Sequence, residues 1–401
     1  MTMKERISKK EKIQQSVDVI DATLRKISLK IHSNPELAFN EHNAVEWLIE
    51  PLKEAGFKIE KGVANLDTAF TGTWEGTPGG PTIGILAEYD ALPVLGHACG
   101  HNIIGPAAIG AALSLKMAYP NLPGKIIVIG TPAEEDGGGK ILMCDEGVFD
   151  DLDVAMMVHP RKETMVLRGG LACVSAVFKF YGKESHASSA PELGISALDA
   201  VLNSFSAINS LRQFFTDDVR VHGIILKGGD APNVVPAYCE AEFIIRASTK
   251  ERLIDVKEKV YRAVEGASLA VGVRCEIEEG LVYAERNNNK VLANAFKNNL
   301  ELMNIEVVEP LKHGGIGSSD IGNVGEVTAT IHPYIKIGEV IPHTPEFAEA
   351  TKSEAGMVGL NQAAKGLAMT AYDLCVDPLL LRSIRKEFED WRLANKKNYI
   401  D

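Results

Sequence analysis

A cysteine and a histidine stand two positions apart in a glycine-rich segment, Gly96-His97-Ala98-Cys99-Gly100-His101. In an extended loop the side chains at positions i and i+2 point the same way, so Cys99 and His101 could bind one metal ion, with Gly100 letting the backbone come close. The alternative is a buried cysteine beside a histidine that caps a helix. A motif this short does not decide between the two.

Three acidic residues follow an apolar segment directly, in the stretch 132–139, which reads PAEEDGGG. Adjacent carboxylates at the end of a strand repel one another unless cations or hydrogen-bond donors compensate them. Because neighbouring residues face different directions, one glutamate could bind a metal ion while the next stays free as a base. The alternative is a solvated acidic turn.

Two further histidines follow apolar or loop segments. His159 closes the segment 156–158, and His343 lies in the loop 342–345 before a predicted helix. Taken alone, His159 is typical of a satisfied core residue and His343 of a surface loop. Together, five potential ligands come from four loops at one edge of one sheet, the arrangement that a two-metal hydrolytic site needs: Cys99, His101, Glu135, His159 and His343.

The segments that must position these residues alternate between strands and helices. Apolar residues spaced by three and four from Ile13 to Ile31 predict a first helix, and a second follows through Trp47 and Leu52. The next segments predict strands over 82–86, 125–131 and 154–158, and helices over 103–118 and 140–147. This alternation predicts an α/β domain with a mostly parallel sheet and helices on both faces. Its ligand crevice lies beyond the carboxyl ends of the strands, where the candidate ligands stand.

From about Leu171 the pattern changes to β-α-β-β-α-β, the order of a ferredoxin-like unit. Its predicted elements are strands over 174–180, 219–226, 238–247 and 273–277, and helices over 194–215 and 250–269. The α/β pattern then resumes with helices over 290–302 and 352–373 and a strand over 327–331. We therefore expect residues 171–283 to form an inserted domain, and residues 1–170 and 284–401 to build the first domain together.

Composition narrows the class of protein. The 401 residues include 42 Lys and Arg against 54 Asp and Glu, a net charge of -12, which disfavours nucleic acid and anionic membranes as partners. The first dozen residues lack an apolar signal region, so we expect a cytoplasmic protein. The uncharged run 91–115 is long enough to cross a bilayer, but its prolines, glycines and histidines favour a buried loop and helix.

Several segments, in order and spacing, resemble metallopeptidase family 20, the family of aminoacylases, carboxypeptidase G and amino-acid-conjugate hydrolases. The most similar branch looks like the aminobenzoyl-glutamate hydrolases and β-alanyl-dipeptide dipeptidases. The resemblance spans nearly the whole chain and rests on HSNPELAFNEH, EYDALPVLGHACGHN, GTPAEEDGGGK, VHP, ESHASSAPELGISALDA, GGDAPNVVPAYCEAEFIIRA, GSSDIGNV and PHTPEF. It implies a zinc-exopeptidase-like catalytic domain with an inserted lid and dimerisation domain, and hence a homodimer.

The resemblance also implies roles for the candidate ligands. Cys99 is implied as a shared ligand, the other four complete two metal sites, and Glu134 becomes the general base. Distant members have an H-x-D motif where this chain has Glu88-Tyr89-Asp90, so His101 takes the place of that histidine and Asp90 becomes an outer contact of the site. Asn102 stands where many relatives have Asp, which leaves the surroundings of His101 open. A thiolate favours Zn, while carboxylate and imidazole also suit Mn or Co.

In the inserted domain the resemblance implies that His186 reaches the partner's active site and stabilises the oxyanion, and that Asn233 and Arg246 line the substrate pocket. From the residues alone, His186 is typical of a helix entry and Arg246 of a strand-end surface charge. A guanidinium suits a substrate that bears a carboxylate. Ser319, in the glycine-rich stretch 314–323, either lines the pocket or makes the turn.

These observations predict a metal-dependent amidohydrolase. It cleaves the C–N amide bond of a small N-acyl amino acid, amino-acid conjugate or dipeptide with water activated by two divalent ions, while Glu134 transfers the proton. One alternative is the hydrolytic removal of an amine from a non-peptide compound such as an aromatic ring. The remoter ones are a thiol hydrolase with Cys99 as nucleophile and His97 or His101 as base, and a protein that binds a ligand without catalysis.

Overall fold

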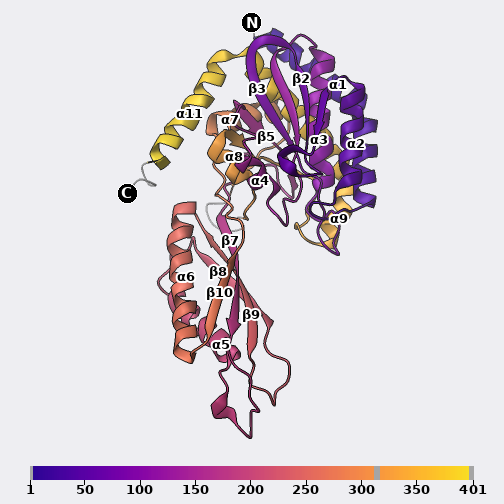
Figure 1. Ribbon diagram of the computed structural model, residues 1–401. Coiled ribbons are helices and arrows are strands. Elements are labelled where there is room, and N and C mark those ends of the chain that lie inside the picture. Colours follow the sequence, from indigo (N-terminus) through magenta and orange to yellow (C-terminus); the bar gives the residue numbers. More distant parts are fainter. Residues whose placement is uncertain (1–2, 311–316, 397–401) are drawn as a thin grey trace. The chain divides into compact units, whose positions relative to one another are not determined.

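The computed structural model describes residues 3–310 and 317–396 and contains two compact units (Figure 1). Unit 1 comprises residues 1–169 and 287–401, and unit 2 comprises residues 170–286. Residues 314–316, which begin the glycine-rich stretch before Ser319, lie outside the described residues.

Unit 1 is built on a six-stranded mixed sheet in the order β1-β2-β4-β3-β5-β11. Strands β4, β3, β5 and β11 run parallel, while β1 and β2 add antiparallel pairs at one edge. The strands are β1 (Lys58–Lys61), β2 (Phe70–Glu75), β3 (Thr77–Ala87), β4 (Pro123–Gly130), β5 (Val154–Met156) and β11 (Ala329–Ile331); β6 (His159–Arg161) and β12 (Tyr334–Lys336) form a separate parallel pair. The α/β class with a mostly parallel sheet, predicted from the sequence, is confirmed.

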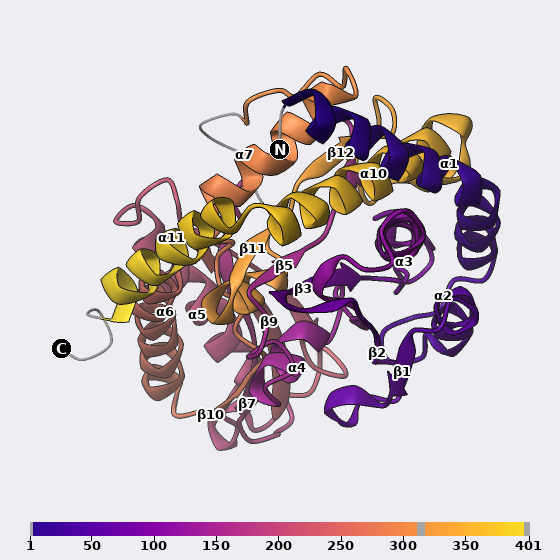
Figure 2. The same ribbon diagram turned by 90° about the horizontal axis from the view of Figure 1, so that it is seen from above.

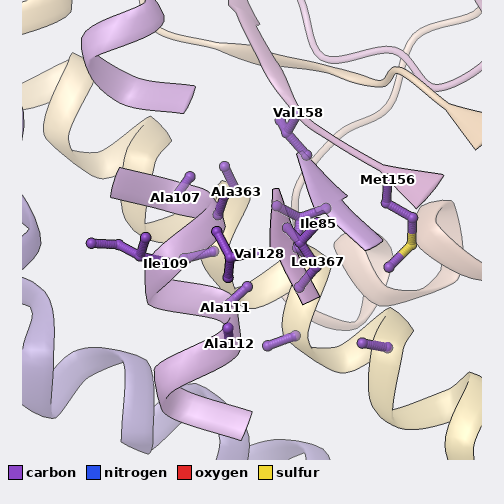
Figure 3. Close-up of a cluster of buried hydrophobic side chains, with 14 of the residues drawn as sticks. Ile85, Ala107, Ile109, Ala111, Ala112, Val128, Met156, Val158, Ala363 and Leu367 are labelled. Carbon is purple, nitrogen blue, oxygen red and sulfur yellow. The ribbon is translucent and has the colours of Figure 1, made fainter. Parts of the chain in front are cut away.

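The helices of unit 1 pack over a large and a smaller cluster of buried apolar residues. They are α1 (Met3–Ser33), α2 (His42–Glu54), α3 (His101–Ala118), α4 (Gly139–Asp145), α7 (Lys290–Leu302), α8 (Ile321–Val327), α9 (Pro345–Lys352), α10 (Glu354–Val376) and α11 (Pro378–Lys396), with a short 3-10 turn over Val63–Asn65. Helix α3 is buried on nearly every side because its sequence, uncharged up to Leu115, packs against both α1 and α10 (Figure 2). Figure 3 shows the larger cluster, in which small side chains of α3 and α10 meet the strands: Ala107, Ala111, Ala363, Leu367, Ile85 and Val128.

Most predicted elements form, and the exceptions have local causes. The helix predicted over 352–373 is α10, which begins two residues later: Lys352 ends α9, and the Ser353 side chain caps α10 by accepting a hydrogen bond from the Gly356 amide. Val327 belongs to helix α8, so the strand predicted from that residue begins only at Ala329. Strands β1 and β2 and helix α11 were not among the predicted elements.

Unit 2 is a ferredoxin-like domain with four antiparallel strands in the order β10-β7-β9-β8. Its elements are β7 (Ala172–Tyr181), a 3-10 turn (Pro191–Leu193), α5 (Ala197–Arg212), β8 (Arg220–Lys227), β9 (Tyr238–Ala247), α6 (Lys250–Val271) and β10 (Arg274–Glu279). Alternate residues of β7 and β9 are buried against the two helices, which explains the period-2 pattern of their sequences.

The first and last segments of unit 2 lie side by side. The Cys173 amide donates to the Tyr283 carbonyl at 3.0 Å, and the Tyr283 amide donates to the Cys173 carbonyl at 2.9 Å. The chain therefore enters and leaves this unit at one place. Within the described part of the chain, no helix combines the length and apolar composition that crossing a bilayer requires.

Candidate metal centre

The loops after three parallel strands of unit 1 begin at the same level of the sheet. Ala87 at the end of β3 pairs with Gly130 at the end of β4, and Ile85 pairs with Met156 at the end of β5. Asp90 and Glu134 lie in the loops after β3 and β4, and His159 begins β6 shortly after β5, as the alternation of strands and helices predicts.

Cys99, His101 and His159 converge, with one potential ligand atom of each lying within 4.8 Å of the others. The Cys99 Sγ is 3.3 Å from His159 Nε2, and His159 Nδ1 lies 2.8 Å from the Pro160 carbonyl oxygen. Gly100 has a φ of +91°, and a Cβ atom there would lie 2.3 Å from Pro160 Cγ. Only glycine therefore lets this loop pack so close to the segment that carries His159.

His101 begins helix α3 and is fully buried. Its Nδ1 is 2.8 Å from Asp90 Oδ1, and the second carboxylate oxygen of Asp90 accepts the Glu135 amide at 3.0 Å. Burial favours a higher pKa for Asp90, but His101 and the Glu135 amide hold that pKa below its usual value. The nearby Asn102 side chain, whose effect on His101 the sequence left open, donates to Ser28 Oγ, and Asp90, expected as an outer contact of the site, lies against His101 Nδ1.

The acidic turn after β4 brings both glutamates toward His101. His101 Nε2 lies 3.8 Å from Glu135 Oε1 and 4.0 Å from Glu134 Oε2. The turn begins at Ala133, which has a positive φ of 59° and donates its amide to the buried carboxylate of Glu41 at 2.9 Å. Burial raises the pKa of Glu41 to about 7. This glutamate was missed from the sequence, although it lies in the stretch HSNPELAFNEH.

His343 approaches the same cluster from the loop before α9. Its Nε2 is 3.7 Å from Glu135 Oε1, and its amide donates to the Ala98 carbonyl at 2.8 Å. Cys99, Glu135 and His343 form a second set of ligand atoms within 4.8 Å of one another. The five predicted ligands thus meet in unit 1: Cys99 belongs to both of these groups, and Glu135 forms a further group with His101 and Glu134.

A buried ion network borders this cluster. The fully buried Lys140 ammonium lies 2.6 Å from Glu88 Oε1 and 2.7 Å from Asp320 Oδ1. Burial opposes the charge of Lys140, but Asp320 and Glu88 raise its pKa above the usual value. Burial raises the pKa of Glu134 well above normal, and the charges of Glu88, Glu135 and Asp320 add to this effect.

The sequence placed Lys140 only in a predicted helix; the signal that could have marked it is a lysine directly after an acidic, glycine-rich turn. Ser319, next to Asp320, is buried, and its hydroxyl has no hydrogen-bond partner among the described residues. His332 was also missed, and its ring stacks on that of His159 at a centroid distance of 5.4 Å.

The predicted residues of unit 2 fall into two places. His186 Nδ1 accepts hydrogen bonds from the Ser188 and Ser189 amides at 3.3 and 3.2 Å, and the Asn233 carbonyl in the neighbouring loop accepts the Ala187 amide. Arg246 lies near the opposite end of β9, where it pairs with Cys173. From Tyr238, at the end of β9 nearer His186, to Arg246 the strand rises by roughly 26 Å at 3.3 Å per residue.

Comparisons with known proteins agree with this architecture. The model of the M20 peptidase dimerisation domain matches residues 170–270. The chain is 38% identical to the Xaa-Arg dipeptidase of Mus musculus, over 95% of this chain and 92% of that protein. It is 34% identical to one of the subunits of the p-aminobenzoyl-glutamate hydrolase of Escherichia coli (strain K12), over 69% of this chain and 62% of that protein.

A solved structure gives the same fold. It is that of a dinuclear metal-binding M20 peptidase from Bacillus subtilis, with a TM-score of 0.68 at 21% identity, covering 89% of this chain and 99% of that one. The resemblance drawn from the motifs is thereby confirmed, as is the fold class. The chain belongs to the M20 metallopeptidase family, whose members hydrolyse C–N bonds.

Proposed function

We propose that this protein is a dinuclear metal-dependent hydrolase that cleaves the amide bond of a small substrate with a free carboxylate, such as a dipeptide or an amino-acid conjugate. The convergence of the five ligand residues carries the proposal. His101 Nε2 and Glu135 Oε1 are buried, and neither atom has a hydrogen-bond partner among residues 3–310 and 317–396. A buried imidazole nitrogen and carboxylate oxygen facing each other without donors fit a cation between them.

The donor set suits Zn, Mn or Co, because it joins one sulfur to imidazole nitrogens and a carboxylate. In the buried group of Cys99, His101 and His159, each histidine uses its Nδ1 in a hydrogen bond. His101 pairs with Asp90 and His159 with the Pro160 carbonyl, which leaves Nε2 of each ring for the ion. Two bound ions supply Lewis-acid chemistry, by lowering the pKa of water and polarising a carbonyl.

Glu134 is the proposed proton carrier. It stands beside Glu135, 4.0 Å from His101 Nε2, and takes a proton from water and passes it to the leaving nitrogen. Burial and the charges of Glu88 and Glu135 raise the pKa of Glu134, which favours its taking up a proton. In the thiol-hydrolase alternative Cys99 has to ionise, but burial and the charge of Glu135 raise the pKa of this thiol well above its usual value.

The lid residues act from unit 2. Because His186 Nδ1 accepts hydrogen bonds, its proton sits on Nε2, which can donate to an oxyanion. We propose that His186 and Asn233 serve the partner subunit's site and that Arg246 binds the substrate carboxylate with its guanidinium fork. Arg246 lies at the end of β9 that is far from His186. This separation supports a role for Arg246 in the active site of its own subunit and a role for His186 in that of the partner subunit.

A homodimer is part of this proposal, as is a cytoplasmic location. Strand β8 is an edge of the unit 2 sheet, and Ile224, Ile225 and Leu226 along it are exposed. An apolar edge strand favours pairing with a second copy. Light scattering coupled to gel filtration tests this, since a monomer with full activity rules out service of His186 to a partner.

The decisive experiment is a turnover screen with Zn, Mn and Co added separately to metal-free protein. The substrates are dipeptides ending in arginine and aminobenzoyl-glutamate, which the names of the two relatives support, and β-alanyl dipeptides and N-acyl amino acids, which the motif resemblance implies. We expect release of both halves of at least one substrate, only with metal. Full activity after metal removal contradicts the proposal, and ammonia released without a second organic product favours the deaminase alternative.

A further inference from the structure

The site holds a group of carboxylates that the proposed metal ligands do not use. Oxygen atoms of Glu88, Glu134 and Asp320 lie within 4.8 Å of one another. Of these three, Glu134 is the proposed base and the other two have no role in the proposed reaction. Three carboxylates in this arrangement are the hard oxygen donors that divalent cations such as Mn²⁺ prefer.

A side chain of the protein already supplies a positive charge there. Lys140 Nζ donates a charge-assisted hydrogen bond to Asp320 Oδ1 at 2.7 Å and forms an ion pair with Glu88 Oε1 at 2.6 Å. The Lys140 amide also donates to the second oxygen of Asp320 at 2.9 Å. Lys140 is fully buried, so backbone and side chain together fix its ammonium.

We propose that Lys140 is a positioning residue whose ammonium replaces a metal ion at Glu88, Glu134 and Asp320 and thereby keeps Glu134 free as a base. This inference rests on the proposed function, in which Glu134 carries the proton and Glu135 binds metal. The two glutamates are adjacent and lie at similar distances, 4.0 and 3.8 Å, from His101 Nε2. Proximity to the metal site therefore does not separate their roles.

Lys140 distinguishes the role of Glu134 as a base from that of Glu135 as a metal ligand. With its ammonium in place, one positive charge lies against both Glu88 and Asp320 and offsets part of their negative charge, and this group donates hydrogen bonds and accepts none. Without it, the two carboxylates remain buried and uncompensated, and a divalent ion is the available replacement. Glu134 is the third oxygen donor of that group, so an ion bound there takes Glu134 as a ligand and stops it from carrying protons.

The test compares the metal content and the kinetics of full-length variants. In equilibrium dialysis against Mn²⁺, wild type is expected to bind up to two ions per chain and Lys140→Met one more. In the variant kcat falls by about a hundredfold or more, the scale of lost general-base catalysis, while KM changes by less than about threefold. Lys386→Met, at an exposed lysine of α11 paired with Asp390, is the matched control and stays like wild type.

A second variant keeps the inference testable if Lys140→Met does not fold. Lys140→Met/Glu88→Gln/Asp320→Asn removes the buried charges together, and it is expected to bind Mn²⁺ as wild type does and to keep kcat within about tenfold. The inference is overturned if Lys140→Met binds no additional ion, or if the triple variant folds with two ions but loses kcat as the single variant does. A wild-type protein that binds no metal contradicts the proposed function instead.

Discussion

Asp90→Asn is the substitution for which the structure gives the sharpest expectation. The carboxylate of Asp90 is fully buried and holds two proposed metal ligands at once. One oxygen is 2.8 Å from His101 Nδ1, and the other accepts the Glu135 amide at 3.0 Å. An asparagine has one acceptor oxygen, so its amide group must face one of these two donors.

The variant therefore loses one charge-assisted hydrogen bond, and the NH2 group of its side chain faces either His101 Nδ1 or the Glu135 amide, each of which is itself a donor. Loss of such an outer partner of a metal ligand weakens metal binding by about 10- to 100-fold. This corresponds to about 1.4 to 2.7 kcal/mol of binding free energy. The same loss of orientation affects His101 and Glu135, so we expect both ions to bind more weakly.

Competition with a chromophoric chelator gives the Zn²⁺ dissociation constants of wild type and variant. Asp136→Asn is the matched control, because Asp136 is exposed in the same acidic turn and should leave the constants unchanged. An Asp90→Asn protein with native melting temperature and Zn²⁺ affinity within about twofold of wild type refutes the reasoning, since an orientation effect of this kind is tenfold or more.

Three further outcomes follow from the site. Glu134→Gln should lower kcat by about 10²- to 10⁴-fold with metal content unchanged in elemental analysis, and a variant that loses its metal instead makes Glu134 a ligand. Gly100→Ala should lower the melting temperature and metal retention, because its Cβ would lie 2.3 Å from Pro160 Cγ at a φ of +91°; native values contradict the packing argument. Burial raises the pKa of Glu41 from 4.5 to about 7, so its contribution to stability is full below pH 4.5 and is lost as the pH rises through about 7. Glu41→Gln should flatten this loss when melting temperatures are compared at pH 4.5 and 8, and an unchanged slope contradicts the assignment to Glu41.

The convergence of the ligands could be predicted because it depends on strand ends. Residues after successive parallel strands meet at one edge, so the positions of Glu134, Glu135 and His159 in the sequence already place them together. Their roles as ligands and base stay predictions until metal binding is measured.

The ion network at Lys140 could not be predicted in the same way. Its partner Asp320 lies 180 positions later, and local sequence does not distinguish a buried lysine at a helix start from a solvated one.

The adjoining ends of unit 2 bear on how proteins of this kind diversify. Cys173 and Tyr283 hold the first and last segments of unit 2 side by side. Unit 2 is therefore attached to unit 1 like a domain inserted into a single loop. Such an insertion can be lengthened, exchanged or mutated along its edge strand while the loops that carry the proposed metal ligands are inherited unchanged. Under the proposed function, substrate choice and bond-breaking chemistry can therefore evolve at separate rates within one gene.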